Sequence, residues 1–390
     1  MIILGIYGAL GWDGNISFPG QGMEDAWVHG SSATLFIDGK LYGSLGEERL
    51  TRVKHDGRYP ENVISQLLSR NSLTPNDVDI VMYVGTPNKC TYYYKRMGYF
   101  EQELNIKFPN AKVFLVDHHK CHGVASFVCS GFEEANIFTF DGGGELRDVP
   151  MTYDKKYEHS NNTSNLFQGN LKEKTVRLLY STWAPMGCFG MFYSNMALMA
   201  YNLKLFGINF DKWKEERETF EGKVMGLSAY GDHTKIDFIP EPFILEKFHG
   251  FPALRWNPDY IFTFDQKLIY LPEDIKGEDL AAWAQYTFEK WLLLFLKEIP
   301  SKIKTKKICL GGGCSLNILA NSKIIEEGIY EDVFVNPAPN DDGLSFGAAS
   351  IGTLKFEKDI ILPDNKGCIG FDYSDNVIYE AIQKNNIQEA

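Results

Sequence analysis

Two histidines and two aspartates have the types and spacing that suit a shared metal ion. His118 and His122 are four residues apart, so on a helix both imidazoles project from one face. Asp141 and Asp341 each follow a predicted strand where it enters a turn. This donor set suits Fe(II) best, and Mn(II) or Zn(II) less well. The alternatives are packing or surface roles for the histidines and a helix cap for Asp341.

Glycine-containing turns point to a nucleotide. Residues 140–145 (FDGGGE) and 311–313 (GGG) each follow a predicted strand. Backbone N–H groups at such turns and at helix starts can hold phosphate oxygens. Taken singly, each turn is equally well explained by tight geometry without a ligand. Together the turns favour a nucleotide.

The apolar pattern predicts the elements that position these residues. In the first part of the chain, strands are expected at residues 1–7, 32–38, 40–48, 77–85 and 112–117, and helices at 60–73, 90–106 and 118–131. A second strand-and-turn unit follows, with a strand at 135–140 and a hairpin return at 151–159. After it, a long helix is expected at 278–299, and strand-turn-helix units at 307–317 and 332–350. The repetition predicts a duplicated α/β fold that holds a ligand between two lobes.

Composition limits the class of protein. The 390 residues suggest two or three compact units, and the net charge of -12 argues against a broad basic surface for nucleic acid. The apolar run at 291–296 is far too short to span a bilayer, and the start lacks a signal-peptide pattern. Seven cysteines without a CxxC pair fit a reducing compartment. These features predict a cytoplasmic protein without a membrane segment, and the lysine-rich residues 302–307 are expected to form a solvated loop.

Seven stretches of the chain, in order, support a more specific identification. They are ILGI, HGSSATLFIDGKLYGSLGEERLTRVKHD, VDHHKCHGVASF, FDGGGE, EGKVMGLSAYG, GGCSLNILANSK and NPAPNDDGLSFGAA. They resemble the nodulation-type and antibiotic O-carbamoyltransferase family, which includes tobramycin carbamoyltransferase, and more distantly the tRNA threonylcarbamoyltransferase. The resemblance spans roughly residues 1–350.

The resemblance implies a duplicated actin-like, sugar-kinase-like (ribonuclease H-like) α/β fold. The expected units are a first lobe at 1–130, a second lobe at 131–355 with a helical insertion at about 160–300, and the start of an adenylate-forming domain at 356–390. The same four residues chosen from spacing are implied as metal ligands. Implied nucleotide contacts are Gly143, Gly144, Lys223, Gly226, Gly312, Gly313 and Asn317.

The implied reaction moves a carbamoyl group from carbamoyl adenylate, made from ATP and carbamoyl phosphate, onto a hydroxyl group. Because AMP is a good leaving group, the enzyme mainly orients the substrates, polarises the carbonyl through the metal and deprotonates the acceptor. His29, which matches a motif histidine of the family, is the first candidate base, and His55 is the second. A surface histidine is the alternative for each. Residues expected to shape the acceptor pocket, or simply to form a charged hairpin end, are Glu47, Glu48, Arg49, Arg52 and Lys54.

Two departures from the family leave the acceptor and the donor supply open. Residues 8–28 form an added stretch that is expected to be a loop near the acceptor. The chain ends where family members continue into the adenylate-forming domain, so a separate or deleted domain is an expected partner. The acceptor is either a small natural-product hydroxyl or a hydroxymethylated base in DNA. A non-catalytic nucleotide sensor is the alternative from another class.

Overall fold

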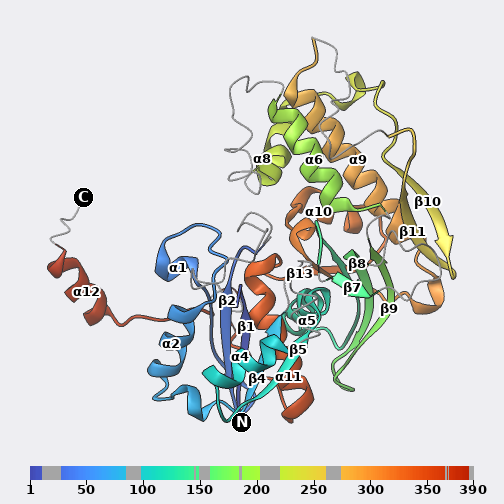
Figure 1. The fold of residues 1–390 in the computed structure, drawn as a ribbon. Coiled ribbons are helices and arrows are strands. Elements are labelled where there is room, and N and C mark those ends of the chain that lie inside the picture. The colour runs from blue at the N-terminus through green and yellow to red at the C-terminus, as the bar shows by residue number, and fades with distance from the viewer. Residues whose placement is uncertain are drawn as a thin grey trace.

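The described residues form two large β-sheets, one in each lobe, and a separate two-stranded hairpin (Figure 1). The computed structural model describes residues 1–10, 28–84, 98–144, 146–148, 159–183, 187–202, 220–260, 274–364, 367 and 369–385. Helices cover the sheets, and the helix-rich part of the second lobe extends away from its sheet (Figure 1).

The first sheet has the strand order β3-β2-β1-β4-β5. Its strands are β1 (Ile2–Tyr7), β2 (Ser32–Ile37), β3 (Lys40–Gly46), β4 (Ile80–Val84) and β5 (Lys112–Val116). Strands β1, β2 and β3 are antiparallel neighbours, whereas β1, β4 and β5 are parallel. Strands β2 and β3 form a hairpin, in which Asp38 and Gly39 have φ values of 48° and 77°, as a two-residue Asp-Gly turn requires.

The second sheet repeats this order. Its strands are β6 (Glu134–Phe140), β7 (Leu146–Asp148), β8 (His159–Asn170), β9 (Thr175–Trp183), β12 (Lys307–Gly311) and β13 (Asp332–Val335). Strands β6, β8 and β9 are antiparallel neighbours, whereas β6, β12 and β13 are parallel, and β7 pairs with one end of β8. When the short strand β7 is set aside, the second sheet has the order β9-β8-β6-β12-β13. Both sheets then have the order third, second, first, fourth, fifth, which confirms the predicted duplicated actin-like fold.

Two helices cross between the lobes. Helix α5 (His118–Ser130) follows the last strand of the first sheet but packs on β6 and β12 of the second. Helix α11 (Leu344–Phe356) follows the last strand of the second sheet but packs on β1 and β4 of the first. The two helices also pack against each other. This exchange brings the starts of both helices to the boundary between the sheets.

The first lobe is completed by α1 (Glu48–Thr51), α2 (Glu61–Arg70) and α4 (Tyr99–Lys107). Strand β3 ends at Gly46 rather than at residue 48, because Glu48 already belongs to α1. The predicted helix at 90–106 is observed from Tyr99, and residues 90–97 lie outside the described residues.

The second lobe contains α6 (Phe189–Asn202), α8 (Phe220–Leu227), α9 (Gly277–Lys297), α10 (Ile318–Glu326) and the hairpin β10 (Phe243–Phe248) to β11 (Phe251–Trp256). The predicted long helix is confirmed as α9, and its apolar face packs against Phe138, Phe140 and Phe189. The expected helical insertion was wrong at its start, since β8 and β9 occupy 159–183 as sheet strands. Most of the predicted return at 151–159 lies outside the described residues, and the observed partner of β6 is β8.

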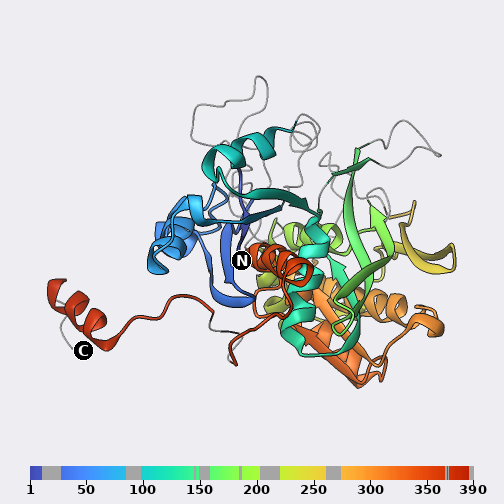
Figure 2. The same cartoon turned by 90° about the horizontal axis from the view of Figure 1, so that it is seen from below.

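The C-terminal segment leaves the body of the protein. Ile361 and Ile369 accept hydrogen bonds from the backbone of β3, at Leu41 and Ser44 respectively. Helix α12 (Asp375–Lys384) then stands apart from both lobes (Figure 1, Figure 2). Among the described helices, none combines the length and apolar character needed to cross a membrane.

Candidate metal centre

His118, His122, Asp141 and Asp341 meet at the boundary between the lobes. One ligand atom from each residue lies within 4.8 Å of the other three. The Nε2 atoms of the two histidines are 3.1 Å apart, and His122 Nε2 lies 3.2 Å from Asp141 Oδ2 and 3.4 Å from Asp341 Oδ1. The structure thus brings together four residues that come from separate parts of the sequence.

The ends of four secondary-structure elements position these residues. Asp117 caps α5 by accepting a hydrogen bond from the Lys120 backbone N–H, so the helix begins at His118 and places His122 one turn later on the same face. Asp141 follows β6, and Asp341 opens the short 3₁₀ turn η9 (Asp341–Gly343) that leads into α11. All four side chains are largely or fully buried.

Backbone amides hold the Asp141 carboxylate. Its Oδ1 accepts the N–H of Gly142 at 2.7 Å, and its Oδ2 accepts the N–H of Gly313 at 3.1 Å. Gly312 makes the second contact possible, since its φ is 90° and a Cβ there would lie 2.4 Å from Phe140 O. A residue other than glycine would push this turn away from β6.

The buried charges of the cluster stabilise one another. Burial favours a neutral His122, but the carboxylates of Asp141 and Asp341 outweigh it and raise its pKa to about 9. Burial likewise opposes ionisation of Asp341, yet nearby histidines, His118 foremost, lower its pKa to about 2. The histidines also hold the pKa of Asp141 well below its ordinary value despite burial. The two aspartates are therefore anionic at neutral pH.

A divalent cation fits this donor set in charge and in size. The described ion-pair partners of both carboxylates are histidines rather than Lys or Arg, so a doubly charged ion with neutral imidazoles would balance two buried negative charges. Metal–ligand distances of about 2.0–2.2 Å place adjacent ligand atoms about 3–3.5 Å apart. The nitrogen–oxygen separations here are 3.2–4.0 Å. Small side-chain shifts would complete a coordination shell.

Two further residues of the cluster were missed from the sequence. Tyr7 donates a 2.6 Å hydrogen bond to Asp341 Oδ2. His119 lies beside the histidine pair, with its ring nitrogens 3.1 Å from Thr139 Oγ1 and 3.0 Å from the Asn162 carbonyl. Burial lowers the pKa of His119 to about 4, so it is neutral at neutral pH. The duplication could have pointed to Tyr7. Tyr7 ends β1, the first strand of the first sheet, just as Phe140, directly before Asp141, ends β6, the first strand of the second sheet.

Several glycines predicted to contact a nucleotide donate their backbone N–H groups to acceptors within the protein. The N–H groups of Gly144 and Gly312 donate to Asn162 O at 2.6 Å and Pro339 O at 2.8 Å, while that of Gly313 donates to Asp141. These three amides therefore shape the turns. Gly143 lies in the same turn as Gly144, and a phosphate role for the four glycines stays a prediction.

The other predicted nucleotide contacts lie on helices of the second lobe. Asn317 caps α10 by accepting the Ala320 N–H at 3.1 Å, and its amide donates to Gln285 Oε1 at 2.9 Å. Lys223 is exposed on α8, and Gly226 on the same helix has no neighbouring atom within 4 Å of where a Cβ would lie. The nucleotide role of these residues also stays a prediction.

Both candidate bases lie beside the cluster. His29 Nε2 is 3.9 Å from Asp341 Oδ2, and the His55 ring packs edge-on against the His29 ring with centroids 6.2 Å apart. Gly30, with a φ of 70°, allows this loop to approach Asp342, whose Oδ1 would lie 2.5 Å from a Cβ at that position. The His29 side chain remains 31% exposed.

The charged hairpin end has mixed roles. Glu47, expected near the acceptor pocket, is buried and accepts backbone N–H groups of Asn62 and Val63 at the start of α2. This prediction was wrong, because the carboxylate stabilises a helix start. Glu48 accepts the His55 N–H at 2.9 Å. The exposed charged residues of this segment are Arg49, Arg52 and Lys54.

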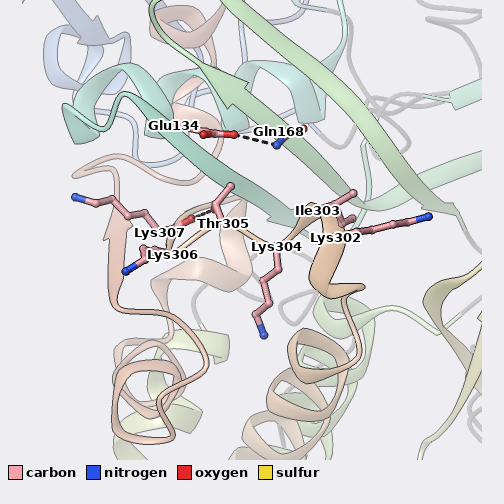
Figure 3. Close-up of a pocket in the computed structure, with 8 residues that line it drawn as sticks. All are labelled: Glu134, Gln168, Lys302, Ile303, Lys304, Thr305, Lys306 and Lys307. Atoms are coloured by element: carbon pink, nitrogen blue, oxygen red, sulfur yellow. Dashed lines mark hydrogen bonds between the residues drawn. The ribbon is translucent and has the colours of Figure 1, made fainter.

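The lysine-rich loop at 302–307 lies at the other end of the second sheet, where β12 begins. It lines a pocket of about 420 Å³ together with Glu134 and Gln168. Lys302 and Lys304 point in different directions, whereas Lys306 and Lys307 extend toward the same side (Figure 3). Lys306 and Lys307 pair with Glu331 and Asp332 at 2.8 and 3.0 Å. The expected solvated loop is confirmed.

Comparison with known proteins assigns the chain to a family. The family model described as Carbamoyltransferase N-terminus matches residues 92–350. The chain is 25% identical over 376 residues to nodulation protein NolNO of Sinorhizobium fredii, covering 90% of this chain and 49% of that protein. It is also 25% identical over 238 residues to nodulation protein NolO of Bradyrhizobium diazoefficiens, covering 60% of this chain and 37% of that protein.

The chain spans about half the length of the curated relatives it matches. Among solved structures, T. kodakarensis HypF is similar over 95% of this chain and 49% of that chain, with 13% identity and a TM-score of 0.49.

Proposed function

Because this chain belongs to the carbamoyltransferase N-terminus family, we propose that it transfers a carbamoyl group from carbamoyl adenylate to a hydroxyl acceptor. The observation that supports a metal-dependent reaction is the convergence of two imidazoles and two carboxylates within 4.8 Å. The proposed ligands are His118, His122, Asp141 and Asp341. Fe(II) is the preferred ion, with Mn(II) or Zn(II) as alternatives.

When bound, the metal ion supplies a Lewis acid that polarises the carbamoyl or phosphate oxygen, an effect worth several kcal/mol of transition-state stabilisation. The protein orients this centre through the Gly313 N–H on Asp141 and the Tyr7 hydroxyl on Asp341. Because both carboxylates are fixed before substrate arrives, little reorganisation is needed during the reaction.

His29 is the proposed general base. Its imidazole is partly exposed and lies 3.9 Å from an Asp341 oxygen, which can orient the ring and stabilise the imidazolium that forms when it accepts the hydroxyl proton. The negative carboxylate thus serves His29 through one oxygen and the proposed metal through the other. His55 is the second candidate, since it packs against His29.

The donor and acceptor follow from the same proposal. Carbamoyl adenylate is proposed to come from ATP and carbamoyl phosphate through an adenylate-forming domain, whether in the same polypeptide or a separate one. The acceptor is proposed to be a small hydroxyl compound, because the net charge of -12 disfavours binding to a nucleic-acid backbone. A cytoplasmic location is part of this proposal.

The direct test supplies synthetic carbamoyl adenylate and a library of hydroxyl compounds to the iron-loaded protein. We expect a product heavier by one carbamoyl group, detected by mass spectrometry, together with release of AMP in equal amount. A protein that binds the adenylate tightly but leaves every hydroxyl compound unmodified, including hydroxymethylated DNA, would support the sensor alternative.

A further inference from the structure

We infer that Tyr7 is a positioning residue that fixes which oxygen of Asp341 faces the metal. This inference rests on the proposed function, in which Asp341 is a metal ligand. Tyr7 ends β1 and is fully buried. Its hydroxyl donates to Asp341 Oδ2 at 2.6 Å, and its ring packs edge-on against His118 with centroids 6.2 Å apart. It therefore contacts two of the four proposed ligands.

The β-sheet holds the Tyr7 hydroxyl in place. Strand β1 lies between β2 and β4, and Tyr7 pairs with Ser32 on one side and Val84 on the other. A central strand has little freedom to shift, since any slip would break the hydrogen bonds on both sides. The hydroxyl is thus a rigid donor rather than a flexible surface group.

The hydrogen bond makes the two oxygens of Asp341 unequal. Oδ1 lies 3.6 Å from His118 Nε2 and 3.4 Å from His122 Nε2. Oδ2 faces Tyr7 and lies 3.9 Å from His29 Nε2. With Oδ2 engaged by Tyr7, the carboxylate presents only Oδ1 to the metal, which leaves coordination positions open for substrate. The same constraint keeps Oδ2 directed at the proposed base.

Loss of the phenol hydroxyl should therefore weaken and alter metal binding. Outer-shell partners of this kind are typically worth about 10–100-fold in metal affinity. Without its donor, the Asp341 carboxylate can rotate or bind through both oxygens. Either change alters the number or geometry of ligands around the ion.

Tyr83 provides a matched control. It lies on β4, is also buried, and donates its hydroxyl to the Gly8 carbonyl at 2.7 Å. Its partner is a backbone carbonyl rather than one of the four proposed ligands. Tyr7→Phe and Tyr83→Phe each remove one buried hydroxyl and retain the ring, so both should lower stability to a similar degree.

The experiment titrates Co(II) into metal-free wild-type protein and both variants, with affinity from equilibrium dialysis and ligand geometry from the visible absorption spectrum. We expect Tyr7→Phe to lower Co(II) affinity about 10–100-fold and to change the intensity and position of the absorption bands. Tyr83→Phe should retain the wild-type affinity and spectrum. Titration well below the unfolding temperature of each variant separates positioning from loss of fold.

Two results would overturn the inference in different ways. If Tyr7→Phe binds Co(II) with wild-type affinity and spectrum, Tyr7 does not position the ligand, while the proposed metal centre survives. If wild-type protein binds no Co(II), Fe(II), Mn(II) or Zn(II), the metal centre itself is wrong, and the role of Tyr7 falls with it.

Discussion

The Nε2 atom of His118 lies 3.6 Å from Oδ1 of Asp341, although the two residues open helical segments from opposite halves of the duplicated fold. This contact exists because α5 and α11 exchange lobes, each packing on the sheet that did not precede it. Duplication therefore supplies two helix starts at one boundary, and the proposed metal centre uses both. Separation of the lobes would break the centre apart.

Asp141→Asn should abolish metal binding while preserving the fold. The amide oxygen can still accept one of the two backbone hydrogen bonds, from Gly142 or from Gly313, whereas the NH₂ group cannot accept the other, and the site loses one of its two negative charges. We expect metal affinity to fall by more than about 100-fold, beyond the usual effect of an outer-shell change. Metal content by elemental analysis and transfer from supplied carbamoyl adenylate measure the loss. The control is Asp279→Asn, which alters a buried carboxylate on α9 and should retain both properties.

Gly312→Ala should damage the centre through the backbone. The backbone of Gly312, with φ 90° and ψ 161°, lies in a region that costs a residue with a Cβ about 1–3 kcal/mol, and the added atom would also approach Phe140 O to 2.4 Å. The matched control is Gly328→Ala, where φ is 62° and a Cβ meets no other atom within 4 Å. Chemical denaturation should show the larger loss for Gly312→Ala, and only that variant should bind metal more weakly. Equal metal affinity in the two variants would argue against a link between this turn and Asp141.

His29→Gln should separate catalysis from metal binding. A general base contributes about 10²–10⁴-fold to rate, so transfer should fall by that factor while the bound metal stays at the wild-type level. His55→Gln should have less than about a tenfold effect, because His55 contacts His29 rather than Asp341. The reverse ranking in a steady-state assay would assign the base to His55.

Asp56 should make the loop that holds His55 sensitive to acid. Its carboxylate accepts hydrogen bonds from Arg58 at 2.6 and 2.9 Å and from Thr51 at 2.8 Å, and these contacts, those of Arg58 foremost, lower its pKa. A lowered folded-state pKa means that this stabilisation is present above about pH 4 and is lost as the pH falls through the folded value. Asp56→Asn should therefore cost about 1–2 kcal/mol near neutral pH.

The free energy of unfolding of wild type and of Asp56→Asn should be measured at several pH values. The difference between the two free energies should become smaller as the pH falls. The expected loss of unfolding free energy is modest because the Arg58 side chain is 55% exposed, so solvent screens the ion pair. Arg58→Gln should remove the same pH dependence by taking away the main cause of the pKa shift. A constant difference between pH 7 and pH 3 would show that the charge of Asp56 does not stabilise the loop.

Local sequence patterns predicted most elements of the first lobe, the long helix α9 and the four-residue cluster for a physical reason, whereas the strands and helices between residues 159 and 260 were not predicted individually. Strand ends with glycine and acidic turns recur at Asp141 and Asp341, and the i, i+4 spacing of His118 and His122 is itself a helix property. The parallel strands of each sheet then bring those ends together. What remained hidden depends on contacts between distant segments. Tyr7 meets Asp341 only after α11 has crossed onto the first sheet.

Backbone hydrogen bonding was the other feature that local patterns did not reveal. A glycine turn after a strand suggests free N–H groups, yet the Gly312 amide donates to Pro339 and the Gly313 amide to Asp141. Glu47 looked like a pocket residue because it lies among charges, but it anchors the start of α2. In both cases the partner lies far along the chain or in a different element, so spacing alone carries no signal of it.

A crystal structure of the metal-loaded protein, with anomalous diffraction recorded on both sides of the iron absorption edge, would test the proposed metal centre most directly. We expect one anomalous peak at about 2.0–2.2 Å from His118 Nε2, His122 Nε2 and an oxygen of each aspartate. No peak at this position, in crystals of protein that still transfers the carbamoyl group, would contradict the proposed metal centre.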